Sequence, residues 1–442
     1  MIKKYDVLVL GTGPAGFYSA LTCAKGGLKT AVVERAVMGG TGFASGCLPV
    51  KILLDKIKSI RNMEKMAGQW ESSFNSMSFY KHAFNEIGSH EQLVSSHSKD
   101  RFQKSGIDFY QSDGHFCDKN TYKIDKGKIS ADRIIIATGT EPDLFKGNSF
   151  GSGILNHSDV FKLKSIPGEI TIIGGDVEGI EFASLLSQLG TRVRIIEQMS
   201  MILPGYDRDL VLPIIDELEK KNVEFFCSTK VLKIFEANDE HIIASENKKF
   251  HTSQILITGL RKPSIPQGAE ALGLKLKDGF IQVDRNYESS IPGIYAVGDI
   301  NGILGMAGAA SQQAVQLGDY LLKGRDIQSD YSILPRAVFS VPGICGGGIQ
   351  ENDLKNPEEY QIKVFPLKQC WRTMYTAGID DFVKIIIDKD EIVMGIWFSG
   401  DGVDVFGSSI GIYLKNKLTL DDLRRDLYVH PTAFESLFEA GL

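Results

Sequence analysis

Two parts of the chain repeat one order of elements, and this repeat limits the fold more than any other feature. Each copy has a short apolar strand, a loop rich in glycine, a helix, and a second strand that ends in Glu. The first copy comprises strand 7–10, the loop Gly11-Thr12-Gly13-Pro14-Ala15-Gly16, a helix to about Gly26, strand 30–33 and Glu34. The second comprises strand 170–173, the loop Gly174-Gly175-Asp176-Val177-Glu178-Gly179, a helix to about Leu189, strand 192–196 and Glu197. Both copies place the acid 18 residues after the last loop glycine, so the pattern predicts an α/β fold with two Rossmann-like nucleotide-binding domains.

The first loop has the features that dinucleotide binding needs. A loop without side chains lets backbone N–H groups and the N-terminus of the next helix face a pyrophosphate, and an acid at the end of the following strand accepts hydrogen bonds from ribose hydroxyls. Gly11, Gly13, Gly16 and Glu34 supply these groups in the required order. We interpret this copy as a dinucleotide site rather than a structural glycine turn.

The second loop departs from this pattern where phosphate would come closest. Asp176 takes the middle glycine position, and Glu178 adds a second carboxylate. Two anions beside a pyrophosphate in a partly desolvated cleft would weaken its binding by on the order of 1 kcal/mol or more. Glu197 disfavours a 2′-phosphate, so NAD is favoured over NADP. Two interpretations stay open: NAD binding at ordinary affinity, or a domain that keeps its fold and has lost its ligand.

The length of 442 residues predicts about three domains. Strands 132–136 and 255–257 lead out of the two halves, and strand 293–299 with helix 308–322 is predicted to return to the first half. From about residue 331 strands are followed by amphipathic helices without a glycine loop, which predicts a C-terminal α+β domain. The predicted domains are 1–148 with 266–330, then 149–265, and finally 331–442.

Composition excludes several classes of protein. The formal charge is −6 and no long basic run occurs, so nucleic acid is not expected as a partner. The six cysteines show neither CxxC spacing nor the density of a secreted disulfide scaffold, and the N-terminal apolar stretch is too short for a membrane span. We therefore predict a cytoplasmic protein in a reducing compartment, without a membrane span, and we single out no metal-ligating set.

A third signal is Gly39-Gly40-Thr41-Gly42-Phe43-Ala44-Ser45-Gly46-Cys47-Leu48-Pro49-Val50-Lys51. Here the sequence resembles the pyridine nucleotide-disulfide oxidoreductase family, most closely its dihydrolipoamide dehydrogenase branch, and the resemblance runs over nearly the whole chain. Further matches occur in the family's order at Ala137-Thr138-Gly139, Glu181, Arg261 with Pro263, Gly298-Asp299, and His430-Pro431-Thr432 with Glu435. The resemblance implies that the C-terminal domain is a dimerisation domain.

The resemblance also implies cofactors and roles. FAD is expected on Gly11, Gly13, Pro14, Ala15, Gly16, Glu34, Gly40, Thr41, Gly46, Ala137, Thr138, Gly139, Gly298 and Asp299. NAD, if bound, is expected on Gly174, Gly179 and Glu197. Lys51 and Glu181 would pair beside the flavin ring. His430 and Glu435 would reach the neighbouring subunit's site, so a homodimer is expected.

One departure decides how much function this resemblance carries. The family's loop has two cysteines five positions apart; here Gly42 stands at the first position and Cys47 at the second. A dithiol cycle therefore cannot run at this site unless another cysteine replaces the missing one. Beside Lys51 and a flavin, the Cys47 thiol is expected to have a lowered pKa and to cycle through a sulfenic acid or a mixed disulfide. The alternatives are that Cys47 is a buried remnant and that His430 is structural at the dimer interface.

These patterns together predict a flavoprotein oxidoreductase. Electrons would pass from NADH through FAD and Cys47 to a small thiol or disulfide, a peroxide or a quinone-type acceptor, while ordinary dihydrolipoamide dehydrogenase activity is not expected. A second hypothesis is a non-catalytic or regulatory FAD-binding protein whose NAD binding is impaired by Asp176 and Glu178.

Overall fold

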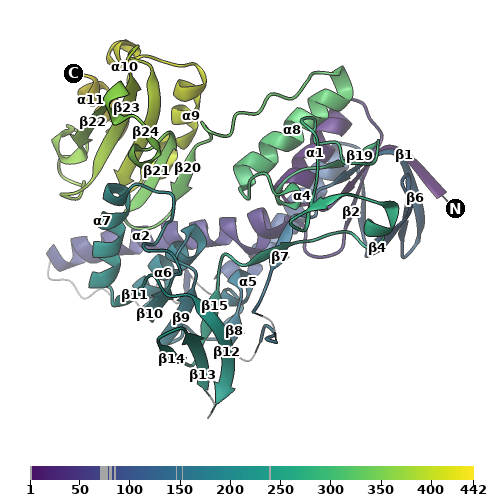
Figure 1. Cartoon of the computed structure of the whole chain (residues 1–442), viewed down its shortest axis with the longest axis horizontal. Helices are drawn as coiled ribbons and strands as arrows, with labels where there is room; N and C mark the ends of the chain where they lie inside the picture. Colours follow the sequence, from purple (N-terminus) through teal and green to yellow (C-terminus); the bar gives the residue numbers. More distant parts are fainter. Residues whose placement is uncertain are drawn as a thin grey trace.

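The computed structural model describes residues 2–69, 78, 82–83, 86–145, 147–151, 153–237 and 240–442. Within these residues the main strands form sheets of seven, five and five strands. Figure 1 shows one body around each of these sheets, with the N-terminus and the C-terminus in different bodies. The two α/β bodies and the C-terminal antiparallel sheet confirm the predicted fold class.

The first sheet contains the first glycine loop. Its strand order is β3 (Asp108–Gln111), β2 (Thr30–Glu34), β1 (Ile2–Leu10), β6 (Gly127–Ile136), β5 (Thr121–Ile124) and β4 (Gly114–Asp118), and β19 (Ile294–Ala296) pairs with the end of β6. Strands β3, β2, β1, β6 and β19 are parallel. β1 begins at Ile2 rather than near Val7 as predicted, because Ile2–Tyr5 pairs with Lys128–Ala131. Exposed lysines in this segment concealed the strand from a search for apolar runs.

Two helices that are distant in sequence pack together beside this sheet (Figure 1). α1 (Pro14–Lys25) follows the glycine loop, and α8 (Ala307–Lys323) follows β19. Their backbones approach closely, since a Cβ at Gly318 of α8 would lie 2.4 Å from Thr22 Cγ2 of α1. β19 and α8 thus bring residues beyond 290 back to the first sheet. The domain boundaries at 148, 265 and 330 stay predictions.

The second sheet is entirely parallel. Its order is β11 (Val223–Phe226), β10 (Arg192–Ile196), β9 (Glu169–Ile173), β15 (Ile255–Ile257) and β8 (Ile154–Leu155). α6 (Val177–Gln188) and α7 (Arg208–Lys220) belong to this body, as does the antiparallel sheet of β12 (Val231–Ala237), β13 (Glu240–Ser245) and β14 (Lys249–Thr252). β9, α6 and β10 form the second βαβ unit at the predicted positions.

Two features connect the first and second bodies. The chain leaves through β7 (Thr140–Pro142) and returns through β16 (Arg261–Pro263), and these segments pair antiparallel with each other. α2 (Cys47–Gln69) comes from the first body, but its buried face shares a hydrophobic cluster with the second sheet. These two bodies also contain α4 (His90–Lys104), α5 (His157–Val160), β17 (Leu276–Lys277) and β18 (Phe280–Ile281). Residues 52–104 thus include most of α2 and all of α4, and part of the segment between these helices lies outside the described residues.

The third sheet is antiparallel, in the order β20 (Arg336–Val338), β21 (Gly343–Gly348), β24 (Val393–Gly400), β23 (Phe382–Asp388) and β22 (Tyr360–Pro366). α9 (Gly407–Lys415), α10 (Leu420–Arg425) and α11 (Ser436–Gly441) accompany it. Lys384 of β23 is fully buried and binds carboxylates at 2.9 Å (Asp207), 2.6 Å (Asp209) and 3.3 Å (Glu351). Because Asp207 and Asp209 belong to the second body, this cluster attaches the C-terminal sheet to it.

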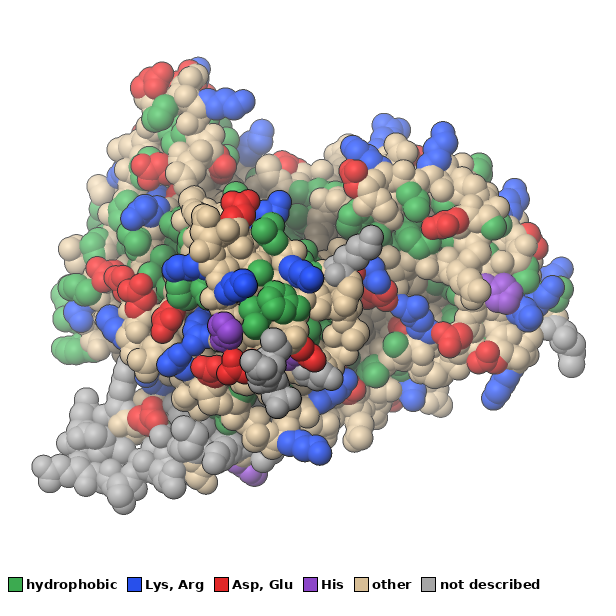
Figure 2. All heavy atoms as spheres, turned by 60° about the horizontal axis from the view of Figure 1, so that its bottom comes forward, with side chains coloured by type: hydrophobic (Ala, Val, Ile, Leu, Met, Phe, Trp, Pro, Cys, Tyr) green, Lys and Arg blue, Asp and Glu red, His purple; other side chains and the backbone are tan. Residues whose placement is uncertain are grey.

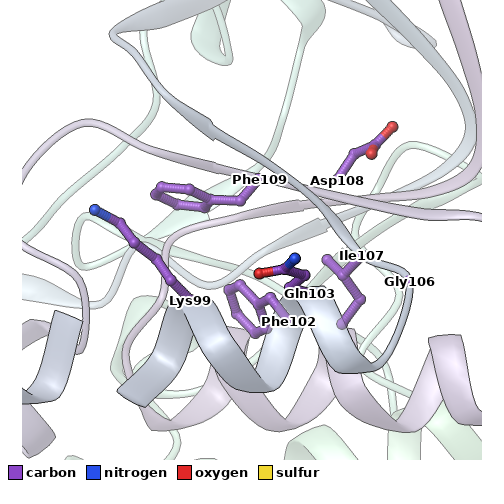
Figure 3. Close-up of a pocket in the computed structure, with 7 residues that line it drawn as sticks. All are labelled: Lys99, Phe102, Gln103, Gly106, Ile107, Asp108 and Phe109. Atoms are coloured by element: carbon purple, nitrogen blue, oxygen red, sulfur yellow. The ribbon is translucent and has the colours of Figure 1, made fainter. Parts of the chain in front are cut away.

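The surface shows acidic and basic side chains intermixed over the face seen in Figure 2. None of the described helices is long and apolar enough to cross a membrane. A surface cavity of about 280 Å³ lies at the turn from α4 into β3, lined by Lys99, Phe102, Gln103, Gly106, Ile107, Asp108 and Phe109 (Figure 3). None of these residues belongs to the predicted site.

Candidate active site at the junction of the first two bodies

The loop between β1 and α1 is shaped for close approach. A Cβ at Gly16 would lie 2.0 Å from the Gly11 carbonyl oxygen, so only glycine lets the helix begin this near the strand. Gly13 precedes α1 without a side-chain cap, and a Cβ there would meet nothing within 4 Å. Pro14 and Ala15 form the first turn of the helix. The N-terminus of α1 is therefore open to an anion.

Glu34 ends β2 beside this loop. One of its carboxylate oxygens accepts hydrogen bonds from the Thr12 N–H at 2.9 Å and the Thr12 hydroxyl at 2.7 Å, and the other accepts from the Ala36 N–H at 2.8 Å. These bonds fix the carboxylate at the carboxyl end of the strand. That is the position from which an acid reaches a ribose.

Buried polar atoms nearby fit a polar cofactor. The Thr138 hydroxyl is buried without a hydrogen-bond partner among the described residues. It stands between Ala137 and Gly139 just after β6. Burial raises the pKa of Asp299, which follows Gly298 at the end of β19, while Arg261 and a hydrogen bond from Thr140 act against the rise. An unpaired buried hydroxyl and an open helix N-terminus are features that a bound FAD would satisfy.

The second loop has the same shape but a different chemistry. A Cβ at Gly179 would lie 2.0 Å from the Gly174 carbonyl oxygen, as in the first loop. Here, however, Asp176 caps α6, and its carboxylate accepts from the Val177 N–H at 2.8 Å. Partial burial raises the pKa of Asp176, and Glu197 and Glu178 add to the rise. A carboxylate thus occupies a helix N-terminus of the kind that is open in α1.

Glu197 is held as Glu34 is. It accepts hydrogen bonds from the Gly175 N–H and the Met199 N–H, both at 2.7 Å. The two βαβ units therefore share their strand-end acids and their close glycine packing. They differ at Asp176 and Glu178.

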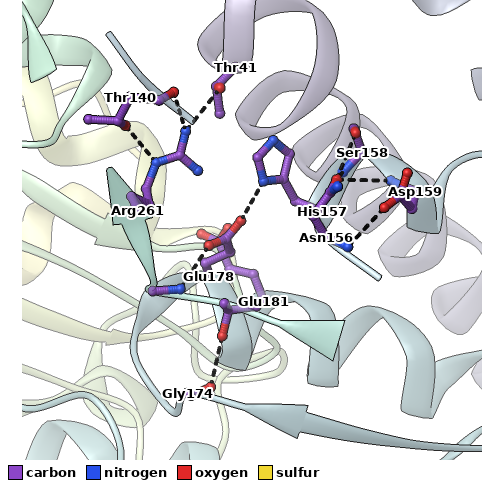
Figure 4. A network of polar contacts seen from close by, with 12 residues as sticks. Thr41, Thr140, Asn156, His157, Ser158, Asp159, Gly174, Glu178, Glu181 and Arg261 are labelled. Atoms are coloured by element: carbon purple, nitrogen blue, oxygen red, sulfur yellow. Dashed lines mark hydrogen bonds and ion pairs between the residues drawn. The ribbon is translucent and has the colours of Figure 1, made fainter. Parts of the chain in front are cut away.

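Glu178 connects three segments (Figure 4). One carboxylate oxygen lies 3.2 Å from Nδ1 of His157 on α5, and the other accepts from the Gly259 N–H, after β15, at 3.3 Å. Burial acts to raise the pKa of Glu178, but the hydrogen bond and charge of His157, helped by Arg261, outweigh it and lower the pKa. Glu178 thereby spans the crevice between the ends of β9 and β15, where dinucleotides cross such sheets.

Cys47 is the first residue of α2 and its side chain is exposed. A π-helical turn, Thr41–Ser45, leads up to it, and Gly40, Thr41 and Gly46 all lie on this approach. Gly42 of the turn faces Pro14: a Cβ added there would lie 2.4 Å from Pro14 Cγ and 2.9 Å from Pro14 Cδ. All six cysteines of the chain are free, so no second sulfur is bonded to Cys47.

The protein groups around Cys47 act against the low pKa predicted for its thiol, while that prediction, which includes a bound flavin, stays a prediction. Although Cys47 reaches solvent, the protein atoms packed around its sulfur raise the pKa of the thiol by desolvation. Lys51 acts to lower this pKa, and the carboxylates of Glu181, Glu178 and Asp299 act to raise it further. Three acids and one lysine surround this sulfur. The prediction counted Lys51 and omitted the acids.

Lys51 and Glu181 lie 2.5 Å apart, so the structure brings these two predicted residues together. Glu181 is almost fully buried on α6 and also accepts from the Phe339 N–H at 3.1 Å. Burial raises the pKa of Glu181, and Lys51 opposes that rise. Lys51 is one helical turn after Cys47 on α2. The ion pair therefore ties the thiol-bearing helix to the second body.

Arg261 makes a second connection at the same junction (Figure 4). Its guanidinium donates to the Thr140 hydroxyl at 2.7 Å, the Thr140 carbonyl at 2.9 Å and the Thr41 hydroxyl at 3.2 Å. The turn before Cys47 is thus bound to the β7–β16 ribbon. Thr41, predicted as a cofactor residue, is held here by the protein.

His430 and Glu435 form a pair away from these groups. Nδ1 of His430 lies 2.9 Å from Glu435, which also accepts from the Thr432 N–H at 2.6 Å. His430 is 69% exposed. The pair lies between α10 and α11, in the C-terminal body (Figure 1). Within one chain it is not part of the Cys47 site.

Sequence reasoning missed His157. The run Asn156-His157-Ser158-Asp159 is an ordinary capping box, in which Asn156 and Asp159 cap α5. Nothing in that pattern marks the histidine as a partner for Glu178. The only available signal was that Glu178, an acid predicted to face a cleft, required a counter-charge.

Comparison with known proteins settles the family. Residues 5–314 match the pyridine nucleotide-disulphide oxidoreductase family, and residues 334–440 match its dimerisation domain. The chain belongs to this family. Members bind FAD and NAD(P). Among curated relatives, dihydrolipoyl dehydrogenase of Bacillus subtilis (strain 168) is 28% identical over 467 positions, covering 100% of this chain and 98% of the relative. That of Thermus scotoductus is 27% identical over 452 positions, covering 100% and 97%.

Solved structures share the fold. The HOCl-induced flavoprotein disulfide reductase RclA from Escherichia coli, as its Cu(II) complex, superposes with a TM-score of 0.88 at 23% identity over 99% of both chains. LpdA from Mycobacterium tuberculosis gives a TM-score of 0.89 at 21% identity, also over 99% of both chains. The arrangement of bodies described above is therefore the fold of these two solved structures.

Proposed function

We propose that this family member is an FAD-dependent, dihydrolipoamide dehydrogenase-like oxidoreductase that works with one thiol. It would take electrons from NADH and deliver them through Cys47 to a small thiol/disulfide couple in its disulfide form, to a peroxide or to a quinone-type acceptor. The observation that carries the proposal is the junction itself: Cys47 starts α2, and the Lys51–Glu181 pair follows one turn later. The fit of Pro14 against Gly42 leaves no room for a second sulfur without movement.

FAD would be held by the glycine loop, Glu34, the segment around Thr138 and Asp299. When bound, it supplies two-electron redox chemistry and accepts hydride from a reduced nicotinamide. The Thr138 hydroxyl would give its unused hydrogen bond to this group. Because Gly42 replaces the family's first cysteine, we propose that Cys47 alone meets the acceptor.

We propose the following roles for the side chains around Cys47. Lys51 offsets the negative charge of a thiolate, and Glu181 orients Lys51 through their 2.5 Å contact. A thiolate attacking a disulfide R–S–S–R forms the Cys47–S–S–R bond and releases RS⁻, which then needs a proton. We propose that His430, oriented by Glu435 and supplied by the partner subunit of a homodimer, donates that proton.

An anaerobic titration with NADH tests the proposal. The flavin-loaded protein should lose its visible flavin absorption at about one equivalent of NADH. A long-wavelength band between the Cys47 thiolate and the oxidised flavin should be present before NADH is added and should disappear as the flavin is reduced. The variant C47S should still bleach but should lack that band. Absence of bleaching at millimolar NADH would overturn the donor assignment.

The acidic side chains of the second glycine loop favour a second candidate function. In that case the protein is a non-catalytic or regulatory FAD-binding protein with impaired NAD binding. Asp176 caps α6, and Glu178 bridges to Gly259 across the crevice. Two variants distinguish the effect of the Asp176 charge from the effect of its side chain at the N-terminus of α6. D176N keeps the helix cap without the charge, and D176G removes both. If repulsion limits binding, each should lower the Kd for NADH by about fivefold or more, the equivalent of 1 kcal/mol. If occupancy of the helix N-terminus limits binding, only D176G should do so.

A further inference from the structure

His157 and Glu178 form a histidine–carboxylate pair that the family motifs do not account for. The imidazole is 5% exposed, and its Nδ1 lies 3.2 Å from Glu178. No described residue is seen to bond its Nε2. In Figure 4 this second nitrogen is directed away from Glu178, to the side on which Thr41 lies. A buried imidazole with one committed nitrogen and one available nitrogen can hold a proton beside a reactive group.

The pair lies against the peptide that carries Cys47. A Cβ at Gly46, the residue before Cys47, would lie 3.4 Å from Cδ2 of His157. Glu178 in turn acts on the thiol through its charge. The pair is therefore within electrostatic reach of the sulfur, and it belongs to the same chain, unlike the predicted His430 and Glu435 of a partner.

We propose that His157 and Glu178 are a positioning pair that sets the ionisation of Cys47, with the protonated imidazole cancelling the carboxylate next to the thiol. This inference rests on the proposed role of Cys47 as the reacting group. The carboxylate alone favours the neutral thiol. The imidazolium–carboxylate pair has no net charge and permits the thiolate, so the pair would retain a reactive sulfur in a cleft that is otherwise rich in acids.

Other charged side chains lie around Cys47 and the His157–Glu178 pair, and the test leaves these residues unchanged. Lys51 lies on the same helix as Cys47, Glu181 on α6, Asp299 after β19 and Arg261 on β16. Asp176 lies two residues before Glu178. Changing His157 to Gln or Glu178 to Gln leaves these residues in place and keeps a hydrogen-bonding side chain at the changed position. E178Q also removes the contribution of the Glu178 charge to the raised pKa values of Asp176 and Glu181.

The test is the pH dependence of Cys47 alkylation by iodoacetamide in the FAD-loaded protein. Modification of the Cys47 peptide is followed by mass spectrometry, which separates it from exposed Cys117 and partly exposed Cys227. E178Q should move the midpoint to lower pH and H157Q to higher pH, each by about half to one unit, a three- to tenfold change in rate at a pH below the midpoint. The double variant should follow E178Q, because the imidazolium matters only while the carboxylate is present.

The opposite signs distinguish this role from a structural one. A loss of packing would move both single variants in the same direction, and that outcome would overturn the proposal, as would two unchanged midpoints. A matched control is H251Q, which removes an exposed histidine that lies 3.2 Å from Glu240, and it should not move the midpoint. If H157Q fails to fold, E178Q alone tests the proposal. An unchanged or raised midpoint of Cys47 alkylation in E178Q would contradict it. The alkylation assay does not require catalytic turnover, so it tests this proposal even if NADH fails to reduce the flavin.

Discussion

The contact between Gly42 and Pro14 yields a prediction with a defined size. A Cβ at position 42 would stand 2.4 Å from Pro14 Cγ and 2.9 Å from Pro14 Cδ, well inside ordinary contact distance, and Ala307 Cβ lies 3.6 Å away. The proline ring is rigid and sits at the start of α1, so it cannot rotate aside. Overpacking of this kind costs about 1–3 kcal/mol, offset by about 0.4–1 kcal/mol because alanine restricts the unfolded chain. Gly42→Ala should therefore destabilise the protein by about 1–2 kcal/mol.

A double-mutant cycle isolates the contact. Pro14→Ala removes Cγ and Cδ, the two atoms that a Cβ at position 42 would meet, so Gly42→Ala should cost little in the Pro14→Ala background. The coupling between the two sites should be at least about 1 kcal/mol, and thermal and urea transitions of the four proteins measure it. Equal effects of Gly42→Ala in both backgrounds, or a stabilised single variant, would refute the steric argument.

The same reasoning applies to introducing a second cysteine at position 42. Gly42→Cys alone should leave Cys47 as a free thiol, because the added side chain meets Pro14. Gly42→Cys with Pro14→Ala should lose two thiols on oxidation if the turn is otherwise compatible with a disulfide. Thiol titration before and after oxidation reads this directly.

Two further predictions concern buried charge. Lys384→Met should destabilise the protein by about 3–5 kcal/mol in calorimetry, because it leaves the carboxylate of Asp207 buried without its cation. The control Lys323→Met, which breaks an exposed pair with Asp319, should cost under about 1 kcal/mol. Equal destabilisation by the two variants would contradict this prediction. Burial raises the pKa of Asp299, so the folded protein holds this proton more tightly than the unfolded chain and loses stability as pH rises through that range. Asp299→Asn should therefore raise the Tm of the cofactor-free protein near pH 7 and should make little difference below about pH 3.5, and a lower Tm at neutral pH would contradict the assignment.

The repeat of strand, glycine loop, helix and acid was sufficient to predict the fold class, because these features are local and each has a steric cause. Gly16 and Gly179 must lack side chains for their helices to begin near the strands, so the sequence shows them directly. The extension of β1 to Ile2 could not be read from apolar periodicity, since it depends on pairing with β6.

The site was less predictable because its properties arise from residues distant in sequence. Lys51 and Glu181 are 130 positions apart, and only the family resemblance joined them. The prediction of a lowered pKa for Cys47 counted Lys51 and the flavin but not Glu178 and Asp299, because the sequence does not show that these carboxylates converge on the thiol and act to raise its pKa. His157 was missed for the same reason.

The paired crossing segments make the second body an insertion with adjacent ends. Pro142 lies opposite Arg261 and Thr140 opposite Pro263, so the chain departs and comes back through neighbouring strands of one ribbon. A short hairpin turn in place of residues 143–260 would therefore connect β7 to β16 without moving either strand. Evolution can thus exchange or modify the inserted body while the first sheet and its glycine loop keep their own strand pairing, but substitutions at Glu178 or Glu181 would also be felt at Cys47 and Lys51.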